Sequence, residues 1–321
     1  MEISSSPRLV LLVQMVMLSV VTVASIHSLA SDESALLALK AYINPETQYI
    51  LANNWTRATS VCNWIGVTCG GRPSRIIALN LSSMGLHGTI PPHIGNLSSL
   101  ALLSLRNNSF YGSLPNEVSC LHSLKTMDFG FNNLTGEFPP WLWSLSELEN
   151  LVLQGNDFLG TVPSSLSNIT SLRRIDLSYN QLWGSISSSI FNVSSLQVID
   201  LSFNRISGTL PADLANYLPE LKELYLSGNQ FYGQIPISLF YCRELQVLSL
   251  SSNDFTGTIP SDLGNSTMLN KLFLSRNRLD GLIPSSIGNC ISLKEINFSE
   301  NNLTDIETKW TKGKFRLGVD L

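Results

Sequence analysis

Aspartates and aromatic residues recur together in the middle of the chain, three positions apart, in an arrangement suited to binding a ligand. The members are Asp128 with Phe131, Asp176 with Tyr179, Asp200 with Phe203, and Tyr225 at the aspartate position of the next segment. Exposed rings on a rigid surface suit capture of a peptide, and the carboxylates are available for basic side chains. These seven residues are the candidate ligand-binding patch. The alternative is that such segments are ordinary structural filler and bind nothing.

Two arginines lie next to this patch. Arg173 and Arg174 precede Asp176 in the chain. Their guanidinium groups could pair with the aspartates or receive a carboxylate of a ligand. Solvated surface charge is the simpler interpretation.

Catalysis is not expected. The four histidines, at positions 27, 87, 93 and 122, offer little material for acid–base chemistry. The sequence contains no phosphate-binding loop, metal-ligand pair or nucleophile elbow. With a net charge of −4 and 14% charged residues, a broad cationic surface for nucleic acid is also not implied. We therefore predict a protein that is not an enzyme and has no metal site and no cofactor.

The patch belongs to a repeat that runs from Ile76 onward. Segments such as "LRRIDLSYNQLWGSIS" and "LQVIDLSFNRISGTLP" can be aligned as ten rows, the last of them incomplete. An asparagine recurs every 24 residues, with one step of 25, at positions 108, 132, 156, 180, 204, 229, 253, 277 and 301. In the first row Met84 stands where the asparagine is expected. This period and pattern indicate an α/β solenoid, a right-handed leucine-rich repeat superhelix of about ten rows.

The repeat explains how the patch would be positioned. In L-x-x-L-x-L the leucines point inward from a short strand and the intervening residues point outward. No row can bury its leucines alone, so only stacking of parallel strands builds a core. The outward positions would line a concave face, and each asparagine would be buried at the turn, where its amide satisfies backbone groups.

A segment with two cysteines precedes the first row and is expected to cover its apolar end. "SDESALLALKAYI", residues 31–43, predicts an amphipathic helix with Ser31 or Asp32 as N-cap and residues 36, 37, 39, 41 and 43 facing the core. In "VCNWIGVTC" we expect Cys62 and Cys69 to be bonded, with Trp64 packed beneath them. The alternative is a metal site, but no further cysteine or histidine clusters nearby.

The other three cysteines are expected to be free. Cys242 and Cys290 occupy a column usually filled by leucine or isoleucine, two rows apart, which is too far for a bond between them. They are expected to act as small buried hydrophobes. Cys120 lies in the neighbouring column.

The two ends of the chain lie outside the repeat. Residues 1–30 contain Arg8, an apolar run and "SLA" before Ser31, which predicts a secretory signal peptide rather than a membrane anchor. The expected organisation is therefore a leader at 1–30, a cap at 31–72, repeats at 73–304 and a tail at 305–321. Secretion would place the mature chain outside the cell.

Ten N-x-S/T sequons are candidate glycosylation sites if the chain is secreted. They are Asn54, Asn80, Asn96, Asn107, Asn133, Asn168, Asn192, Asn265, Asn297 and Asn302. None coincides with an asparagine of the 24-residue column, as expected if those side chains are buried. The alternative is that "GNLSSL" is a structural turn and that only some sequons are modified.

The cap and the first row resemble those of a plant family. "SALLALKAYI", "NNWTRATSVCNWIGVTC" and "RIIALNLSSMGLHGTIPPHIGNLSSL" are similar to the ectodomains of plant leucine-rich-repeat receptor-like kinases and receptor-like proteins, most of all to those that sense microbial patterns. The resemblance covers residues 31 to about 304. It implies a fold with plant-type "L-x-G-x-I-P" repeats and an extracellular or cell-surface location. It also implies a role in signalling or defence perception, with a peptide, protein or co-receptor ectodomain as partner and the membrane reached only through the full-length receptor.

The tail departs from this family. "DIETKWTKGKFRLGVDL" has no repeat pattern, no second cysteine cap, no spanning helix and no kinase motif. The expectation is a truncated ectodomain whose last row is poorly capped. The alternative is a secreted inhibitor similar to polygalacturonase-inhibiting proteins, which have about ten repeats and no kinase but carry more cap cysteines. A third reading is a co-receptor that contacts another ectodomain through one side.

Overall fold

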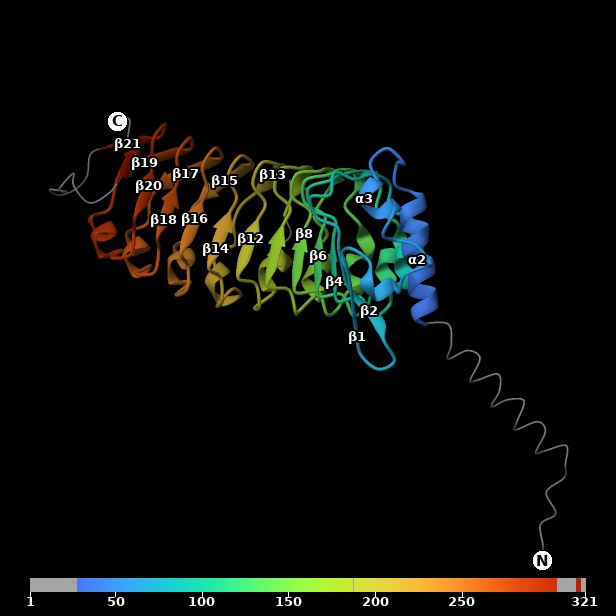
Figure 1. Ribbon diagram of the computed structural model, residues 1–321. Helices are drawn as coiled ribbons and strands as arrows, with labels where there is room; N and C mark the ends of the chain where they lie inside the picture. The colour runs from blue at the N-terminus through green and yellow to red at the C-terminus, as the bar shows by residue number, and fades with distance from the viewer. Residues whose placement is uncertain (1–27, 187, 305–315, 319–321) are drawn as a thin grey trace, which may run out of the picture.

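The molecule is a long solenoid whose turns, called rows here, stack side by side (Figure 1). The computed structural model describes residues 28–186, 188–304 and 316–318. Rows 1 to 10 begin at the main-sheet strands β2 (Arg75–Asn80), β4 (Leu102–Ser104), β6 (Thr126–Asp128), β8 (Asn150–Val152), β10 (Arg174–Asp176), β12 (Val198–Asp200), β14 (Glu223–Tyr225), β16 (Val247–Ser249), β18 (Lys271–Phe273) and β20 (Glu295–Asn297). The predicted leucine-rich repeat solenoid of about ten rows is confirmed.

A second sheet runs along the solenoid beside the main one. It consists of β3 (His87–Gly88), β5 (Ser109–Gly112), β7 (Asn133–Glu137), β9 (Asp157–Gly160), β11 (Gln181–Ser185), β13 (Arg205–Gly208), β15 (Gln230–Gln234), β17 (Asp254–Thr258), β19 (Arg278–Leu282) and β21 (Asn302–Thr304). Short 3-10 helices complete rows 1 to 9, namely η2 (Pro92–Asn96), η3 (Asn116–Cys120), η4 (Pro140–Ser144), η5 (Ser164–Asn168), η6 (Ser188–Asn192), η7 (Leu214–Asn216), η8 (Ile237–Tyr241), η9 (Ser261–Asn265) and η10 (Ser285–Asn289).

Stacking of identical positions builds one continuous core. Neighbouring main-sheet strands from β2 to β20 are parallel and in register, so Leu79, Leu103, Met127, Leu151 and Ile175 follow one another across five strands. All five side chains are fully buried. Each row therefore supplies one layer of a core that exists only when rows pack together.

The asparagines of the 24-residue column, called the ladder asparagines here, join each row to the one before it; four of the nine are buried and five are half-buried. The amide nitrogen of Asn180 donates to the carbonyls of Leu177 in its own row, at 3.1 Å, and Leu153 in the preceding row, at 3.0 Å. Its amide oxygen accepts from the backbone N–H of Phe158, also in the preceding row, at 3.1 Å. The same pattern recurs at positions 108, 132, 156, 204, 229, 253, 277 and 301. The predicted role of the asparagines is confirmed.

This geometry explains the one exception. The asparagine of a row satisfies the turn of the preceding row, and row 1 has only the cap before it. Met84 can therefore replace the asparagine there, while the amide oxygen of Asn108 accepts from the N–H groups of Met84 and Leu86.

The cap helix begins earlier than predicted. Helix α2 (Leu29–Ala41) has Ser28 as its N-cap, in a capping box with Ser31, whereas Ser31 or Asp32 was expected. The domain boundaries and the leader stay predictions, because residues 1–27 lie outside the described part of the chain. Cleavage before Ser31 would remove Ser28 and leave Ser31 or Asp32 to begin the helix.

Most of the expected helix face is buried. Leu36, Leu39 and Ile43 are buried, and Leu37 packs at the edge of the core. Ala41 was also expected to face the core, but it is exposed. The core-facing stripe instead includes Ala35, one turn before Leu39.

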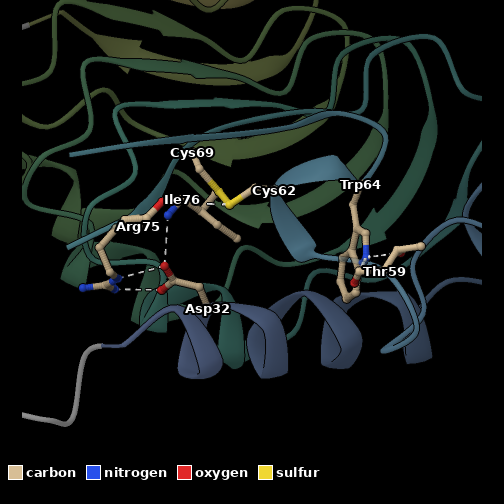
Figure 2. The surroundings of a disulfide bond; sticks show 8 residues. Asp32, Thr59, Cys62, Trp64, Cys69, Arg75 and Ile76 are labelled. Carbon is tan, nitrogen blue, oxygen red and sulfur yellow. Dashed lines mark hydrogen bonds and ion pairs between the residues drawn. A yellow bond between two sulfur atoms is a disulfide. The ribbon is translucent and has the colours of Figure 1, made fainter. Parts of the chain in front are cut away.

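The cysteine segment forms the predicted covering. Helix α3 (Tyr49–Ala52) and the 3-10 turn η1 (Val61–Asn63) lead to β1 (Val67–Gly70), which pairs antiparallel with β2. Cys62 and Cys69 are disulfide-bonded (Figure 2). Trp64 is buried and stacks on Trp55 with ring centroids 5.5 Å apart, and its indole N–H donates to the Thr59 hydroxyl. The pair therefore ties the cap onto the first strand, and the metal-site alternative does not apply.

A buried ion pair ties α2 to row 1, which the sequence did not reveal. The Asp32 carboxylate is fully buried and accepts two hydrogen bonds from the Arg75 guanidinium, at 2.7 and 2.8 Å (Figure 2). It also accepts the backbone N–H of Ile76 at 3.0 Å. Asp32 thus locks the helix to the first residues of β2 instead of capping it.

The far end of the solenoid continues into the tail. Residues 316–318 form β22 (Arg316–Gly318), which pairs parallel with β20. The tail thus contributes one strand to the main sheet, while its assignment as a segment outside the repeat stays a prediction. A parallel pair needs only backbone donors and acceptors, which explains how residues without the leucine pattern can extend the sheet.

The remaining cysteines are free, as predicted. Cys242 and Cys290 are buried, and burial raises the pKa of each thiol to about 11. Cys120 is exposed. The two buried thiols are therefore protonated at neutral pH and behave as small hydrophobes.

We predict that Asn180→Ala lowers the free energy of unfolding by about 1–3 kcal/mol, because it leaves the buried Phe158 N–H without an acceptor. The Leu153 and Leu177 carbonyls each lose one of two amide donors and keep the other, from Asn156 and Asn204. Denaturant unfolding followed by circular dichroism measures the change. Asn116→Ala, at an exposed position of η3, is the control and should change stability by less than about 0.5 kcal/mol. Equal effects of the two substitutions would contradict the role of the ladder.

We predict that Asp32→Ala costs about 3–5 kcal/mol, because it removes the buried carboxylate that pairs with Arg75 and accepts the Ile76 N–H. Glu33→Gln is the matched control, since Glu33 contacts only the highly exposed Arg57, at 3.8 Å. Such a surface pair contributes about 0–1 kcal/mol. The melting temperatures of the two variants give the comparison. If Asp32→Ala lowers the melting temperature no more than Glu33→Gln does, Asp32 does not hold the cap helix to row 1.

Candidate functional site

The three aromatic residues of the predicted patch lie on the main-sheet face, the exposed face of the main sheet. Phe131, Tyr179 and Phe203 each lie three residues beyond the end of a main-sheet strand. Their side chains are 43%, 51% and 49% exposed. Exposed rings that gather on one face of a rigid sheet mark a candidate contact site.

An unusual backbone conformation holds these rings. Phe131, Tyr179 and Phe203 have φ of 54° to 55°, in the left-handed region. The same column has glycine at 155 and 228, where φ is 65° and 68°. Residues other than glycine adopt this conformation at a cost of about 1–3 kcal/mol when the surrounding structure imposes it. The turn before each asparagine therefore fixes the direction of the ring.

The glycines provide room for the rings of the preceding rows. A Cβ atom built on Gly155 would lie 2.7 Å from Cδ1 of Phe131, and one on Gly228 would lie 2.8 Å from Cδ1 of Phe203. Each ring thus leans over the next row. Glycine in this column adopts the left-handed conformation without the cost that other residues bear, and it leaves room for the ring.

The rings and an arginine form two groups on the face. Tyr179 and Phe203 stack with ring centroids 4.4 Å apart and planes 20° apart. Phe131 stands two rows away, and the Arg106 guanidinium lies 4.8 Å from its ring centroid. The structure therefore divides the predicted patch into a row 3 group and a group on rows 5 to 7.

The three aspartates differ in their partners. Asp128 lies 3.5 Å from the Arg106 guanidinium and accepts the N–H of Gly130. Asp176 is only 2% exposed and pairs with Arg174 at 2.9 Å. Arg174 therefore pairs with an aspartate. This was one of the two roles suggested for the arginines, the other being to receive a carboxylate of a ligand. Arg173 is exposed, as expected for solvated charge.

Asp200 has no such partner. No lysine or arginine nitrogen of the described residues lies within 4.0 Å of its carboxylate, which accepts the N–H of Ser202 at 2.9 Å. Burial, with a smaller contribution from the neighbouring Asp176 carboxylate, raises the pKa of Asp200 to about 6. The charged form of this carboxylate is therefore the least stabilised in the patch.

Tyr225 completes the second group beside Asp200. The two residues are opposite each other on β12 and β14, and the Tyr225 hydroxyl donates to the Glu223 carboxylate at 3.2 Å. Burial and the Glu223 charge raise the pKa of Tyr225 to about 12. Tyr225 is thus a neutral hydrogen-bonding group at neutral pH.

A second exposed apolar column was missed by the sequence analysis. Tyr111, Leu159, Trp183 and Tyr232 are all exposed on the second sheet, each three residues after a ladder asparagine. The His87 ring contacts Tyr111 with centroids 4.9 Å apart. We call these residues the second-sheet stripe. Their spacing was visible in the sequence, but no second sheet was expected there.

The sequons lie on accessible backbone, although their modification is untested. Eight of the asparagines are exposed, whereas Asn54 and Asn297 are partly buried. Between Asn133 and Asn297 neither sheet carries a sequon, because Asn168, Asn192 and Asn265 each end a 3-10 helix. The candidate patch on rows 5 to 7 is thus free of candidate glycan positions.

Two kinds of feature, a metal-binding cluster and a membrane-spanning helix, are absent from the described residues. No group of three or more His, Cys, Asp or Glu side chains among them is placed to hold a metal ion. No helix among them has the length and apolar character needed to cross a membrane.

Family comparisons agree with this architecture. Residues 29–70 match the leucine rich repeat N-terminal domain. Residues 170–231 match a leucine rich repeat family, and a second leucine rich repeat family matches 123–145, 147–169, 244–266 and 268–290. The matches thus include the cap and rows on both sides of the patch.

Several of the similar proteins are plant receptor kinases. The LRR receptor-like serine/threonine-protein kinase EFR of Arabidopsis thaliana is 45% identical over 73 residues, which are 23% of this chain and 7% of that protein. The ectodomain of GASSHO1/SCHENGEN3 from Arabidopsis thaliana, solved with CASPARIAN STRIP INTEGRITY FACTOR 2, is 31% identical, with a TM-score of 0.76 over 85% of this chain and 36% of that one.

A second similar structure contains two kinds of partner. The Arabidopsis receptor kinase HAESA, solved with the peptide hormone IDA and the co-receptor SERK1, is 33% identical, with a TM-score of 0.78 over 85% of this chain and 46% of that one. The chain therefore spans less than half of each of these proteins. The polygalacturonase-inhibitor alternative is not favoured. The chain belongs to the leucine-rich repeat family, and over its N-terminal domain and repeats it is similar to the ectodomains of plant receptor kinases.

Proposed function

We propose that this chain is a non-catalytic, extracellular ligand-recognition ectodomain, which binds a peptide or protein through the main-sheet face in signalling or defence perception. The observation that carries the proposal is the pair of stacked, half-exposed rings of Tyr179 and Phe203 beside Asp176, Asp200 and Tyr225. Rigid aromatic anchors next to charged groups are the features of an interface that contribute most to binding energy.

The rigidity of the face supports this proposal. The rings stand on backbone fixed by the turn before each asparagine, and in-register strands hold the rows at a constant spacing of about 4.8 Å. A ligand that binds such a surface immobilises few protein side chains, which lowers the entropic cost of association. An extended peptide could cross several rows and contact one outward column in each.

The related proteins also support recognition of a peptide. The GASSHO1/SCHENGEN3 and HAESA ectodomains were solved with peptide ligands or factors, and HAESA also with a co-receptor. We assign the co-receptor role on this chain to the second-sheet stripe, because Trp183 and Tyr232 are exposed and lie beside the rows that carry the patch. An extracellular or outer plasma-membrane location would expose both faces to such partners.

We predict that the double substitution Tyr179→Ala and Phe203→Ala abolishes peptide capture on the main-sheet face. Loss of two exposed ring anchors should weaken binding at least about 30-fold, as expected for two hot-spot residues of about 1–2 kcal/mol each. Panning of a phage-displayed library of random 12-residue peptides on the secreted ectodomain measures this capture.

The matched control is Tyr111→Ala with Trp183→Ala, which removes two equally exposed rings from the second sheet. Peptides selected on the unmodified protein should still bind this control. Retention of the same peptides by the Tyr179 and Phe203 double variant would rule out the patch as the recognition site.

We predict that Asp200→Asn stabilises the fold at pH 7. The folded state holds the Asp200 proton up to about pH 6, above the ordinary value of 3.8, so its favourable contribution is present below about pH 4 and lost as the pH rises through 6. At pH 7 the amide should therefore gain about 1–3 kcal/mol relative to the carboxylate.

Melting temperatures at pH 7.5, 6 and 4.5 measure this difference, which should shrink as the pH falls. Asp128→Asn is the control, because Asp128 is paired with Arg106 and its neutralisation should give no gain. A gain that is equal at all three pH values would show that ionisation of Asp200 is not its cause.

A further inference from the structure

Row 3 shows how this surface holds a positive charge. The Arg106 guanidinium comes from row 2 and lies between the Asp128 carboxylate, at 3.5 Å, and the Phe131 ring, at 4.8 Å. Asp128 and Phe131 are three positions apart. A carboxylate and a ring at this spacing therefore form a site for a guanidinium, with an ion pair on one side and a cation–π contact on the other.

Row 6 repeats the carboxylate and the ring but not the arginine. Asp200 and Phe203 have the same spacing, and Phe203 has the same left-handed φ of 54°. Ser178 in row 5 stands at the position that Arg106 has in row 2, and its hydroxyl donates to Asp176 at 2.7 Å. Among the described residues no lysine or arginine therefore pairs with Asp200 within 4.0 Å; Arg174, which pairs with Asp176, acts on Asp200 only at longer range.

In row 5 the aspartate already has a cation as partner. Asp176 and Tyr179 also have the three-residue spacing, but Arg174 of the same strand already pairs with Asp176 at 2.9 Å. Tyr179 instead adds its ring to that of Phe203, at 4.4 Å. The two stacked rings therefore present a larger aromatic surface beside Asp200 than Phe131 presents beside Asp128.

The charges around Asp200 favour a cation. Strands β10, β12 and β14 carry three carboxylates, Asp176, Asp200 and Glu223, and one guanidinium, Arg174. Among the cations just outside these strands, Arg173 is exposed and Lys222 donates to the Gln197 side chain at 3.2 Å. When Asp200 is ionised, the three strands have two negative charges in excess.

We infer that the ligand of the main-sheet face presents an arginine or lysine side chain to Asp200 and to the stacked rings of Tyr179 and Phe203. This inference rests on the proposed function and specifies the chemistry of the ligand. Arginine fits better than lysine, because its planar guanidinium can stack on a ring while it pairs with a carboxylate, as Arg106 does in row 3.

The raised pKa of Asp200 gives this contact a pH dependence. The ligand cation needs the ionised carboxylate, whose fraction falls from about nine-tenths at pH 7 to about one-tenth at pH 5 for a pKa of about 6. Binding should therefore weaken up to about tenfold between pH 7 and pH 5, because only the competent fraction binds.

The test compares peptides selected on the secreted ectodomain and on Asp200→Asn from the same phage-displayed library of random 12-residue peptides. On the unmodified protein, arginine or lysine should be enriched at least fivefold at one position, and Asp200→Asn should lose this enrichment. Asp157→Asn, at an exposed position of the second sheet, is the matched control and should keep it.

A synthetic copy of the most enriched peptide then measures the effect of pH. Its affinity should fall toward tenfold between pH 7 and pH 5 on the unmodified protein and stay nearly constant on Asp200→Asn. Because Asp200→Asn is expected to be at least as stable as the unmodified protein, its melting temperature separates loss of selection from loss of folding.

The outcomes distinguish this inference from the proposed function. Peptides that need Tyr179 and Phe203 but carry no common basic residue would overturn the inference and leave the proposed function standing. Basic enrichment that persists in Asp200→Asn would also overturn it. If no selected peptide depends on the two rings, both proposals fail.

Discussion

The fold depends on one kind of hydrogen-bonding group, the side-chain amide of the asparagine that recurs in the rows. Each amide joins its own turn to the preceding row through two donated bonds and one accepted bond. Because buried backbone groups cannot be left unpaired, the spacing of rows and the conformation of the turn are set together. That turn includes the left-handed residue that carries the rings, so the candidate binding surface is a direct consequence of how the core is closed.

The row architecture could be predicted because it is local and repeated. The leucine spacing, the 24-residue period and the cysteine pair each identify a structure that depends on few distant contacts. The second sheet and the Asp32 to Arg75 pair could not be predicted in this way. The first depends on how far each turn extends before the 3-10 helix begins, and the second joins residues 43 positions apart across the cap.

The candidate patch was only partly visible in the sequence. The outward columns identified which residues belong to the main-sheet face, since alternation along a strand is simple. Their grouping depends on packing between rows, which the columns do not encode. Gly155 and Gly228 direct the rings of Phe131 and Phe203, and Arg106 and Arg174 neutralise two of the three aspartates. Asp200 therefore differs from Asp128 and Asp176 because no arginine neutralises it, and not because of its own position in the repeat.

The lean of each ring over the following row has a consequence for protein engineering. Phe131 lies above Gly155, and Phe203 above Gly228, so a surface side chain and the space it needs come from consecutive rows. Exchanging a single row with a homologous receptor would separate a ring from its glycine and bring a Cβ into it. At these two junctions the smallest unit that can be exchanged without a clash is therefore the row with the ring together with the row with its glycine, whereas Tyr179 stacks on the ring of the following row.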